Sequence, residues 1–347
     1  TSNLPDPAVI PSEHFNTVLY TGTGVNNHAI TGVGFQPDFL WIKQRGTTDY
    51  HWVNDAVRGA TNNLYTNVTN AEVGINGGIK AFNTDGFTVG TEGGVNDNTG
   101  SFVAWNWKAN GTGVSNTNGS ITSTVSANAD AGFSIVSYTG NGTANQTVGH
   151  GLSKTPEIII IKGRENAYYW SVINPRRVST SNTNMLYLNV TNAEADDINI
   201  MGDNLPTATT FGVDDYGGVN VNNLGFIAYA FHSVEGYSKM GSYTGNGSAD
   251  GTFVYTGFRP AMVIMKVSSA VSDWRIMDNK RDTYNPNDIL LFPSSQEVEA
   301  TSSTYKIDFL SNGFKQRNTH AGLNTSSSAY IYIAFAEVPF SVGGNAR

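Results

Sequence analysis

Three segments of the chain repeat the same succession of landmarks at nearly constant spacing. Each opens with Tyr-Thr-Gly-x-Gly, passes through a turn that ends in Pro to an apolar run closed by Lys, and then reaches a Trp. The landmarks are Tyr20, Lys43 and Trp52, then Tyr138, Lys162 and Trp170, then Tyr243, Lys266 and Trp274. The step from Tyr to Lys is 23, 24 and 23 residues, and the step from Lys to Trp is 9, 8 and 8. The repeats start 118 and 105 residues apart, which exceeds solenoid periods of about 20–50 residues and approaches the common domain size of about 100–150 residues. The spacing therefore predicts three small tandem domains, each with a modest core of its own.

The composition favours short strands over helices. Charged residues make up 14% of the chain and aromatic residues 11%, with 38 Gly, and runs of strong helix formers are almost absent. Turn signals recur about every 8–12 residues, which is typical of an antiparallel β-sandwich or jelly-roll. The sequence predicts an all-β fold, with short helices expected only at Ala56–Gly59 and Ala71–Val73.

The repeats also set the expected boundaries. Matching strands should open each repeat, at Phe15–Tyr20, Phe133–Tyr138 and Tyr237–Tyr243, and close it, at Phe102–Trp107, Phe226–Phe231 and Tyr330–Phe335. The closing strands alternate aromatic with small or aliphatic residues, as do strands buried on both faces. We expect an extended N-terminal arm at 1–14, modules at 15–109, 132–235 and 236–347, and a Ser/Thr/Asn/Gly-rich linker at 110–131.

Charge and cysteine content exclude several classes of protein. The formal net charge is −8 and no block of Lys or Arg occurs, which counts against nucleic acid because phosphate contacts supply most of that affinity. No apolar run approaches the roughly 18 residues of a membrane-spanning helix, so we expect no membrane insertion. The first residues lack the charged-then-apolar pattern of a secretory signal. The chain has no Cys, which excludes disulfides and thiolate metal sites.

Several phrases resemble a module of tailed bacteriophages, notably marine ones, that recurs in tail-fibre and other virion surface proteins. The resemblance rests on residues 118–128, 132–142 and 147–152, on 15–22 with 30–39, and on the ending 334–340, and it is looser in the third repeat. It implies concanavalin A-like, lectin-type jelly-roll modules and a location on the virion surface after synthesis in the bacterial cytoplasm. The family has no agreed set of functional residues, so none is carried over.

Catalytic patterns are weak. The repeated Gly-x-Gly lacks the third Gly and following helix of a phosphate site, and no Gly-x-Ser-x-Gly elbow is present. The six His show no metal-ligand spacing. Two acidic pairs, Asp196-Asp197 and Asp214-Asp215, could serve glycoside hydrolysis or bind calcium, but both are in the second repeat, and solvated loop acids are the simpler interpretation. We expect a protein without enzymatic activity, cofactor or metal.

The strongest binding pattern is a Trp followed by an Arg. An exposed aromatic platform beside a cation suits a sugar with acidic substituents. The candidates are Trp52, Arg58, Tyr169, Trp170, Arg176, Trp274 and Arg281. Core packing is the competing explanation for these Trp residues and the favoured one. The repeated Lys43, Lys162 and Lys266 are expected to cap strand ends.

These observations predict a virion surface protein, either a tail fibre, a receptor-binding protein or a capsid decoration protein, that binds host-surface glycan weakly and multivalently. A purely structural capsid or tail component is the alternative, and a polysaccharide depolymerase is a third. The expected partners are other virion proteins, in the capsid or tail hub, and further copies of the chain, with a trimer favoured. Leu4, Val9 and Ile10 of the Pro-bearing arm are expected to bury themselves against a neighbour.

Overall fold

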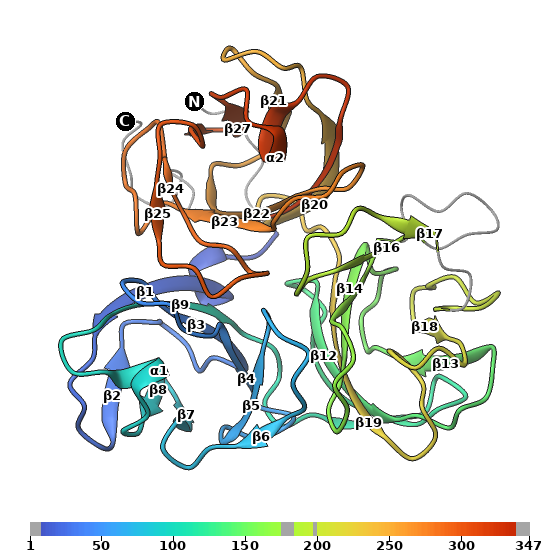
Figure 1. Cartoon of the computed structure of the whole chain (residues 1–347). Coiled ribbons are helices and arrows are strands. Elements are labelled where there is room, and N and C mark those ends of the chain that lie inside the picture. The colour runs from blue at the N-terminus through green and yellow to red at the C-terminus, as the bar shows by residue number, and fades with distance from the viewer. Residues whose placement is uncertain (1–7, 175–183, 197–199, 338–347) are drawn as a thin grey trace.

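Antiparallel strands account for nearly all the regular structure. The computed structural model describes residues 8–174, 184–196 and 200–337, which form three lobes of sheet around a common centre (Figure 1). The all-β prediction is confirmed, and the paired antiparallel sheets are consistent with sandwich packing. We call the lobes copy 1 (15–109), copy 2 (110–235) and copy 3 (236–337).

Copy 1 has a main sheet in the order β1-β9-β3-β4-β5-β6 and a smaller sheet, β2-β8-β7, that faces it. The elements are β1 (Phe15–Thr21), β2 (His28–Thr31), β3 (Phe39–Gln44), β4 (Trp52–Asp55), β5 (Asn62–Tyr65), β6 (Val73–Gly74), β7 (Ile79–Asn83), β8 (Gly86–Val89), α1 (Gly93–Asn96) and β9 (Ser101–Trp107). The 3-10 turn η1 (Pro11–Glu13) precedes them.

Copy 2 repeats this order in its main sheet, where β12-β19-β14-β15 corresponds to β1-β9-β3-β4, and adds β10 and β11 at one edge. Its elements are β10 (Val114–Asn116), β11 (Ser123–Asn128), β12 (Phe133–Thr139), β13 (Gln146–Gly149), β14 (Ile158–Gly163), β15 (Ser171–Ile173), β16 (Asn184–Tyr187), β17 (Ala195–Asp196), β18 (Thr210–Val213) and β19 (Gly225–Phe231). β13 and β18 form the facing sheet.

Copy 3 has the same arrangement, with β20-β28-β22-β23 as its main sheet and β21-β27-β26 facing it. Its elements are β20 (Ser238–Thr244), β21 (Phe253–Tyr255), β22 (Pro260–Val267), β23 (Arg275–Asp278), β24 (Ile289–Leu290), β25 (Ala300–Thr301), β26 (Ile307–Leu310), β27 (Gly313–Gln316), α2 (Ala321–Asn324) and β28 (Ala329–Ala336).

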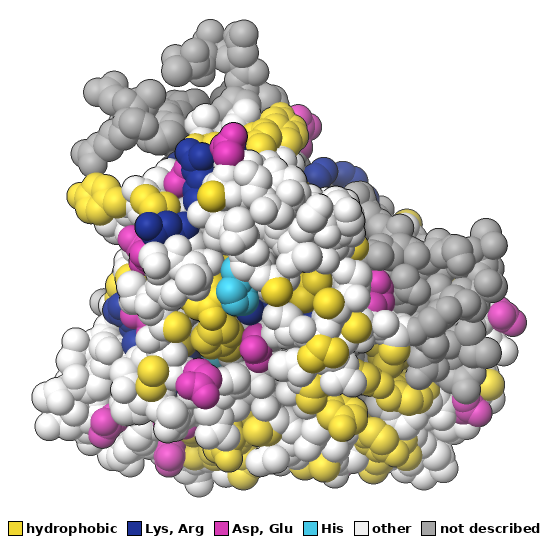
Figure 2. Space-filling view, turned by 45° about the horizontal axis from the view of Figure 1, so that its top comes forward, with side chains coloured by type: hydrophobic (Ala, Val, Ile, Leu, Met, Phe, Trp, Pro, Cys, Tyr) yellow, Lys and Arg dark blue, Asp and Glu magenta, His cyan; other side chains and the backbone are white. Residues whose placement is uncertain are grey.

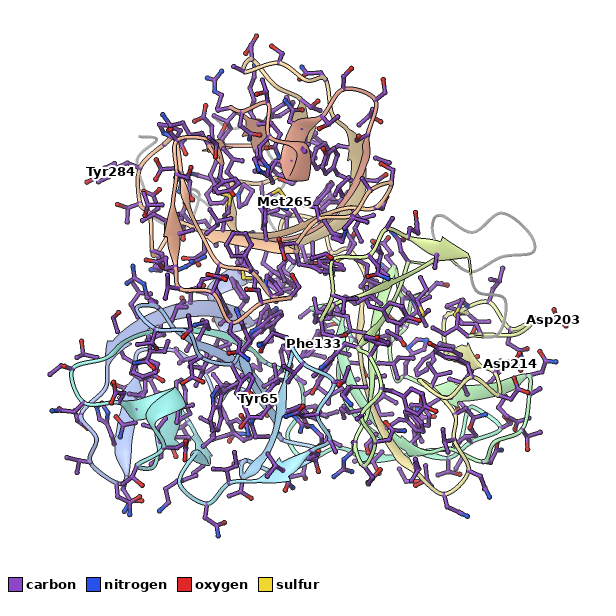
Figure 3. All side chains as sticks on the ribbon, in the orientation of Figure 1. Tyr65, Phe133, Asp203, Asp214, Met265 and Tyr284 are labelled. Atoms are coloured by element: carbon purple, nitrogen blue, oxygen red, sulfur yellow. The ribbon has the colours of Figure 1, made fainter. Side chains whose placement is uncertain are left out.

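The closing strand of each copy is buried on both faces, as its sequence predicts. On β9, Phe102 and Ala104 point into the core of copy 1, while Val103, Trp105 and Trp107 point into a second core at the centre of the molecule. Successive strand residues face opposite sides of a sheet, so one alternating strand supplies both cores. The central core draws residues from all three copies, and Phe133 marks the place where the lobes meet (Figure 3).

The repeated Tyr-Thr-Gly-x-Gly is a structural motif. Its Tyr hydroxyl donates to a backbone carbonyl of a short helix in copies 1 and 3, from Tyr20 to Val95 at 2.7 Å and from Tyr243 to Leu323 at 2.8 Å. In copy 2 the acceptor is Val219, in a turn, at 2.7 Å from Tyr138. A Cβ on the first Gly would lie 2.2–2.4 Å from a backbone oxygen in each copy, so only Gly fits there. The second Gly has φ of +67°, +64° and +67° at Gly24, Gly142 and Gly247, which favours Gly again.

These phenols predict that the protein loses stability at high pH. Burial raises the pKa of Tyr20, Tyr138 and Tyr243 well above the usual value, whereas the unfolded chain ionises near pH 10. Because the folded pKa is the higher one, this contribution is complete below pH 10 and is lost as the pH rises further. We expect urea midpoints to fall between pH 10 and 11.5. NMR of Cζ-labelled tyrosine should show these three signals unchanged until unfolding, and ionisation of all three near pH 10 in the folded protein would contradict the explanation.

Three local predictions are wrong. Residues 110–131 are no linker, because β10 and β11 pair with each other and with β12 and widen the main sheet of copy 2. Ala56–Gly59 is a turn, in which the Asp55 carboxylate accepts hydrogen bonds from the backbone N–H groups of Val57 and Arg58. Ala71–Val73 is extended, and the α-helices of the described residues are instead the short α1 and α2.

The described part of the arm lies against its own chain. The Ala8 N–H donates to the carbonyl of Glu235 at 3.3 Å, and Val9 packs on the central core. Ile10 is 41% exposed, and Leu4 lies outside the described residues. Val9 thus buries its side chain within one chain, while Ile10 stays available to a neighbour.

Candidate functional site

The three Trp residues of the expected platform are buried. Trp52 is 3% exposed, and Trp170 and Trp274 are each 1% exposed. None of them presents a ring face to a sugar, so the exposed-platform hypothesis is wrong for these side chains. The competing explanation, core packing, describes them.

Trp52 is not the structural equivalent of the other two. Trp170 and Trp274 precede β15 and β23 and point into the central core, whereas Trp52 begins β4 and points into the core of copy 1. The equivalent residue is His51: its backbone N–H donates to Asn67 Oδ1 at 2.9 Å, as that of Trp170 donates to Asn189 Oδ1 at 2.9 Å. One extra residue after Lys43 reverses the face of the Trp.

These three positions join neighbouring copies. Trp170 Nε1 donates to the Tyr65 carbonyl of copy 1, and Trp274 Nε1 donates to the Tyr187 carbonyl of copy 2, both at 2.8 Å. His51 lies at the third junction, where its Nδ1 accepts from Trp41 Nε1 at 3.0 Å. Burial, followed by Lys43 and Arg281, lowers the pKa of His51 well below its usual value, although the backbone of Phe292 in copy 3 raises it in part.

Arg58 closes the seam between copies 1 and 2. Its side chain is fully buried and its Nε lies 2.5 Å from Asp55 Oδ2. Tyr229 of copy 2 donates to the same Asp55 oxygen at 2.7 Å. Glu72 accepts from Arg58 at 3.0 Å and from Arg164 of copy 2 at 2.6 and 3.0 Å. Burial alone would lower the pKa of Arg58, but Asp55 and Glu72 outweigh it and the pKa is raised.

Arg281 has the equivalent role in the seam between copies 3 and 1. Its buried Nε lies 2.6 Å from Asp278 Oδ2, which also accepts from Trp105 Nε1 of copy 1 at 3.2 Å. Glu299 accepts from Arg281 at 3.2 Å and from Arg45 of copy 1 at 2.6 and 2.8 Å. Arg58 and Arg281 are therefore committed to ion pairs inside the molecule and are not offered to a ligand carboxylate, which corrects the sequence interpretation.

A backbone hydrogen bond marks the same place in all three seams. The N–H groups of Glu72, Glu194 and Glu299 donate to the carbonyls of Arg164, Ser268 and Arg45, at 2.6, 2.7 and 2.8 Å. Each Glu belongs to one copy and its acceptor to the next, so the three bonds run in one direction around the centre. Arg176 lies outside the described residues. The Lys-x-Arg spacing at 43–45 and 162–164 is the sequence signal for these seams.

The repeated Lys residues hold loops. The Nζ of Lys43, Lys162 and Lys266 each donates to the next residue's carbonyl at 2.6–2.7 Å, and to the carbonyl four residues on at 2.8, 2.9 and 3.2 Å. Burial lowers the pKa of each to about 8. The expected capping of strand ends is thus seen, with the ammonium groups buried rather than solvated.

Of the two acidic pairs, the structure describes the side chains of Asp214 and Asp215. Asp214 is 8% exposed, and its Oδ1 accepts from the backbone N–H of Asn145 at 2.7 Å, at the outer edge of copy 2 (Figure 3). Asp215 is exposed, Asp196 lies on β17, and Asp197 is outside the described residues. No group of three or more His, Asp or Glu side chains suited to a metal occurs in the described ranges.

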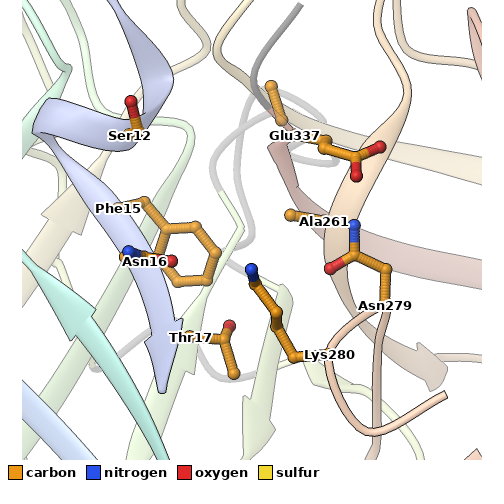
Figure 4. Close-up of a pocket in the computed structure, with 9 residues that line it drawn as sticks. Ser12, Phe15, Asn16, Thr17, Ala261, Asn279, Lys280 and Glu337 are labelled. Carbon is orange, nitrogen blue, oxygen red and sulfur yellow. The ribbon is translucent and has the colours of Figure 1, made fainter. Parts of the chain in front are cut away.

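Two small pockets lie between copies. One, of about 70 Å³, is lined by Phe15 and Thr17 of copy 1 and by Asn279 and Lys280 of copy 3 (Figure 4). Within the described residues, the Thr17 hydroxyl and Asn279 Oδ1 have no hydrogen-bond partner, but the space is well below the roughly 300 Å³ of a typical ligand site. The other, of about 290 Å³ between copies 2 and 3, is lined by Lys239, Met240 and Ser242 among others.

The outer surface carries little charge. In the face shown in Figure 2, acidic and basic side chains are scattered among uncharged polar atoms, with small hydrophobic patches. Of the predicted platform residues, Tyr169 is accessible, at 44% exposed. No helix in the described parts is long and apolar enough to cross a membrane.

The fold and its seams define an all-β protein in which three sheet lobes close around one core. The chain belongs to a family of domains of unknown function, DUF7483, whose model matches residues 10–339. A single family model thus spans all three copies, as the shared core does. No curated protein and no solved structure matches the chain.

Proposed function

We propose that this chain is a non-enzymatic surface protein of a bacteriophage virion, built from three jelly-roll modules. The observation that carries the proposal is the use made of the charged residues. Arg58, Arg281, Asp55 and Asp278 are buried and hold the copies together, and the repeated Lys residues hold loops. These charged side chains thus hold the copies and their loops together and are not offered to a substrate.

A rigid block with three outward-facing lobes suits a particle surface. The resemblance of residues 15–22, 118–128, 132–142 and 334–340 to phage tail-fibre and virion modules supports this placement. The protein would act as a fibre, receptor-binding or decoration protein beside capsid or tail-hub partners, and several weak sites would add their strength through avidity. A homotrimer is the expected assembly. Since the three copies already cover one another inside a single chain, its contacts would come from exposed residues such as Ile10.

Locating the chain in intact particles tests the proposal. A gold-labelled antibody against the purified protein should decorate the outside of virions in electron micrographs, and incubation of the protein with host surface polysaccharide should release no reducing ends. Labelling of infected-cell lysate but not of particles would refute the virion placement. Sugar release that Asp214→Asn abolishes would favour the depolymerase alternative.

A further inference from the structure

Tyr169, Tyr187 and Tyr216 of copy 2 are linked in one cluster, and Tyr168 precedes Tyr169 and approaches Gly217, next to Tyr216. We call these four residues the tyrosine rim. The rings of Tyr169 and Tyr187 lie 4.8 Å apart and are tilted by 40°. The hydroxyl groups of Tyr187 and Tyr216 are 2.7 Å apart. Tyr168 and Tyr169 are 40% and 44% exposed, so the rim presents two accessible tyrosines beside the partly buried Tyr187 and Tyr216.

The backbone beneath the rim is shaped for these rings. A Cβ on Gly217 would lie 2.5 Å from the Tyr168 hydroxyl oxygen, and one on Gly218 would lie 2.7 Å from the Tyr216 ring. Neither Gly has a positive φ. The glycine pair is therefore explained by close approach of the two rings to the loop, which fixes Tyr168 and Tyr216 against the main chain.

Copy 1 keeps the tyrosine pair of the rim, and copy 3 lacks it. In copy 1, Tyr50 and Tyr65 repeat the ring pair at 4.5 Å and 38°, but Tyr65 is only 9% exposed. In copy 3 the corresponding position before Trp274 is Asp273, and Arg275 lies over the Phe292 ring instead, at 5.9 Å. Among the three copies, copy 2 is therefore the one with two adjacent exposed tyrosines at this position, Tyr168 and Tyr169.

The charges around the rim decide which ligand it suits. Glu165, in the loop of Tyr168 and Tyr169, and Asp215, beside Tyr216, are exposed. One Glu165 oxygen accepts from the backbone N–H of Gly225 at 2.6 Å. The nearest described cations are engaged elsewhere: Lys162 holds the carbonyls of Gly163 and Asn166, and Arg164 pairs with Glu72. The rim thus offers ring faces, phenol hydroxyls and carboxylate acceptors. Carboxylates repel an acidic sugar and accept hydrogen bonds from hydroxyl groups.

We propose that the tyrosine rim binds a neutral sugar, with a pyranose ring stacked on Tyr168 and Tyr169 and its hydroxyl groups donating to Asp215 or Glu165. This rests on the proposed role as a surface-binding protein and changes the expected ligand: the sequence pointed to acidic sugars through Arg58 and Arg281, which are buried. Aromatic side chains that combine an apolar face with a polar end suit a ligand with the same two characters.

Titration of the full chain with defined oligosaccharides tests this. Maltohexaose and cellohexaose serve as neutral probes and hexagalacturonate as the acidic one, with binding followed by saturation-transfer NMR up to 10 mM, roughly ten times the weak end of the affinity scale. We expect at least one neutral probe to bind and to be preferred over the acidic one. The double variant Tyr168→Ala/Tyr169→Ala should weaken that binding about tenfold, equal to about 1.4 kcal/mol, while Tyr169→Phe should retain it.

Tyr284→Ala is the matched control, because Tyr284 is 80% exposed and projects from copy 3 away from the rim (Figure 3). The proposal is overturned if neither neutral probe binds, if hexagalacturonate binds more tightly, or if the double variant binds as the control does. None of these results bears on the virion placement, which the labelling of particles decides separately.

Discussion

Replacing Arg58 with Met should lower the free energy of unfolding by about 3–5 kcal/mol, the usual cost of breaking a buried ion pair. The side chains of Arg58 and Asp55 are both fully buried and 2.5 Å apart. Without the guanidinium, the carboxylates of Asp55 and Glu72, both on the copy 1 side of the seam, would lose the buried cation that they share. Urea unfolding followed by circular dichroism measures the loss. Arg281→Met should lower the free energy of unfolding by a similar amount, because Arg281 pairs with the equivalent residues Asp278 and Glu299 in the seam between copies 3 and 1.

Arg317→Met is the matched control. Arg317 also pairs with an Asp, at 2.5 Å from Asp308, but its side chain is 41% exposed. Exposed pairs contribute about 0–1 kcal/mol because water and salt screen them. Losses of equal size at Arg58 and Arg317 would show that the seam pairs do not hold the copies together. The double variant Asp55→Asn/Arg58→Met should recover part of the loss, since it removes the uncompensated charge.

The parts of the fold that depend on local pattern could be predicted from the sequence. The opening and closing strands were placed within one or two residues, because period-two alternation and Gly-rich turns act over a few positions. The central core could not be predicted. A strand buried on both faces has the same residue pattern whether its outer face packs on a neighbouring copy or on another sheet of its own copy. Composition alone makes 110–131 resemble a linker, although Ile121 and Val125 pack in the core of copy 2.

The prediction of the candidate site was wrong because of the alignment of the repeats. Aligning Trp52 with Trp170 and Trp274 was wrong by one residue, and in a strand one residue exchanges the two faces. The sequence points to Arg58 and Arg281 but assigns them to a ligand instead of to the seams. Their partners Glu72 and Glu299 lie in loops without a fixed spacing, and each also pairs with an Arg of the neighbouring copy, Arg164 and Arg45 respectively. Only the three-dimensional arrangement shows that these charges are satisfied internally. Among the predicted residues that the structure describes, the same arrangement leaves Tyr169 exposed.

Copy 3 produced alone, as residues 236–337, should not fold stably, and the whole chain should unfold in one transition. The central face of copy 3 would be exposed on excision. It comprises Tyr237, Met240, Met262, Ile264, Trp274, Ile276, Leu291, Ile331, Ile333 and Phe335. Each large apolar side chain contributes about 1.5–3 kcal/mol when buried, so the loss would approach or exceed the 5–15 kcal/mol that typically holds a domain folded. The sequence suggests three self-sufficient modules, but a large share of each module's buried apolar residues belongs to the central core.

The test compares probes on the full chain and spectra of the fragment. Urea curves from tryptophan fluorescence and from circular dichroism should coincide for the full chain, and the fragment should give a poorly dispersed proton NMR spectrum and rapid proteolysis. Three separable transitions, or a dispersed spectrum with a cooperative melt for residues 236–337, would contradict this.

The expected outcome means that the smallest folding unit is the whole ring of copies. Removing any one copy would uncover the Trp and Arg contacts of two seams at once, so such a protein can vary its outward loops more easily than its number of repeats.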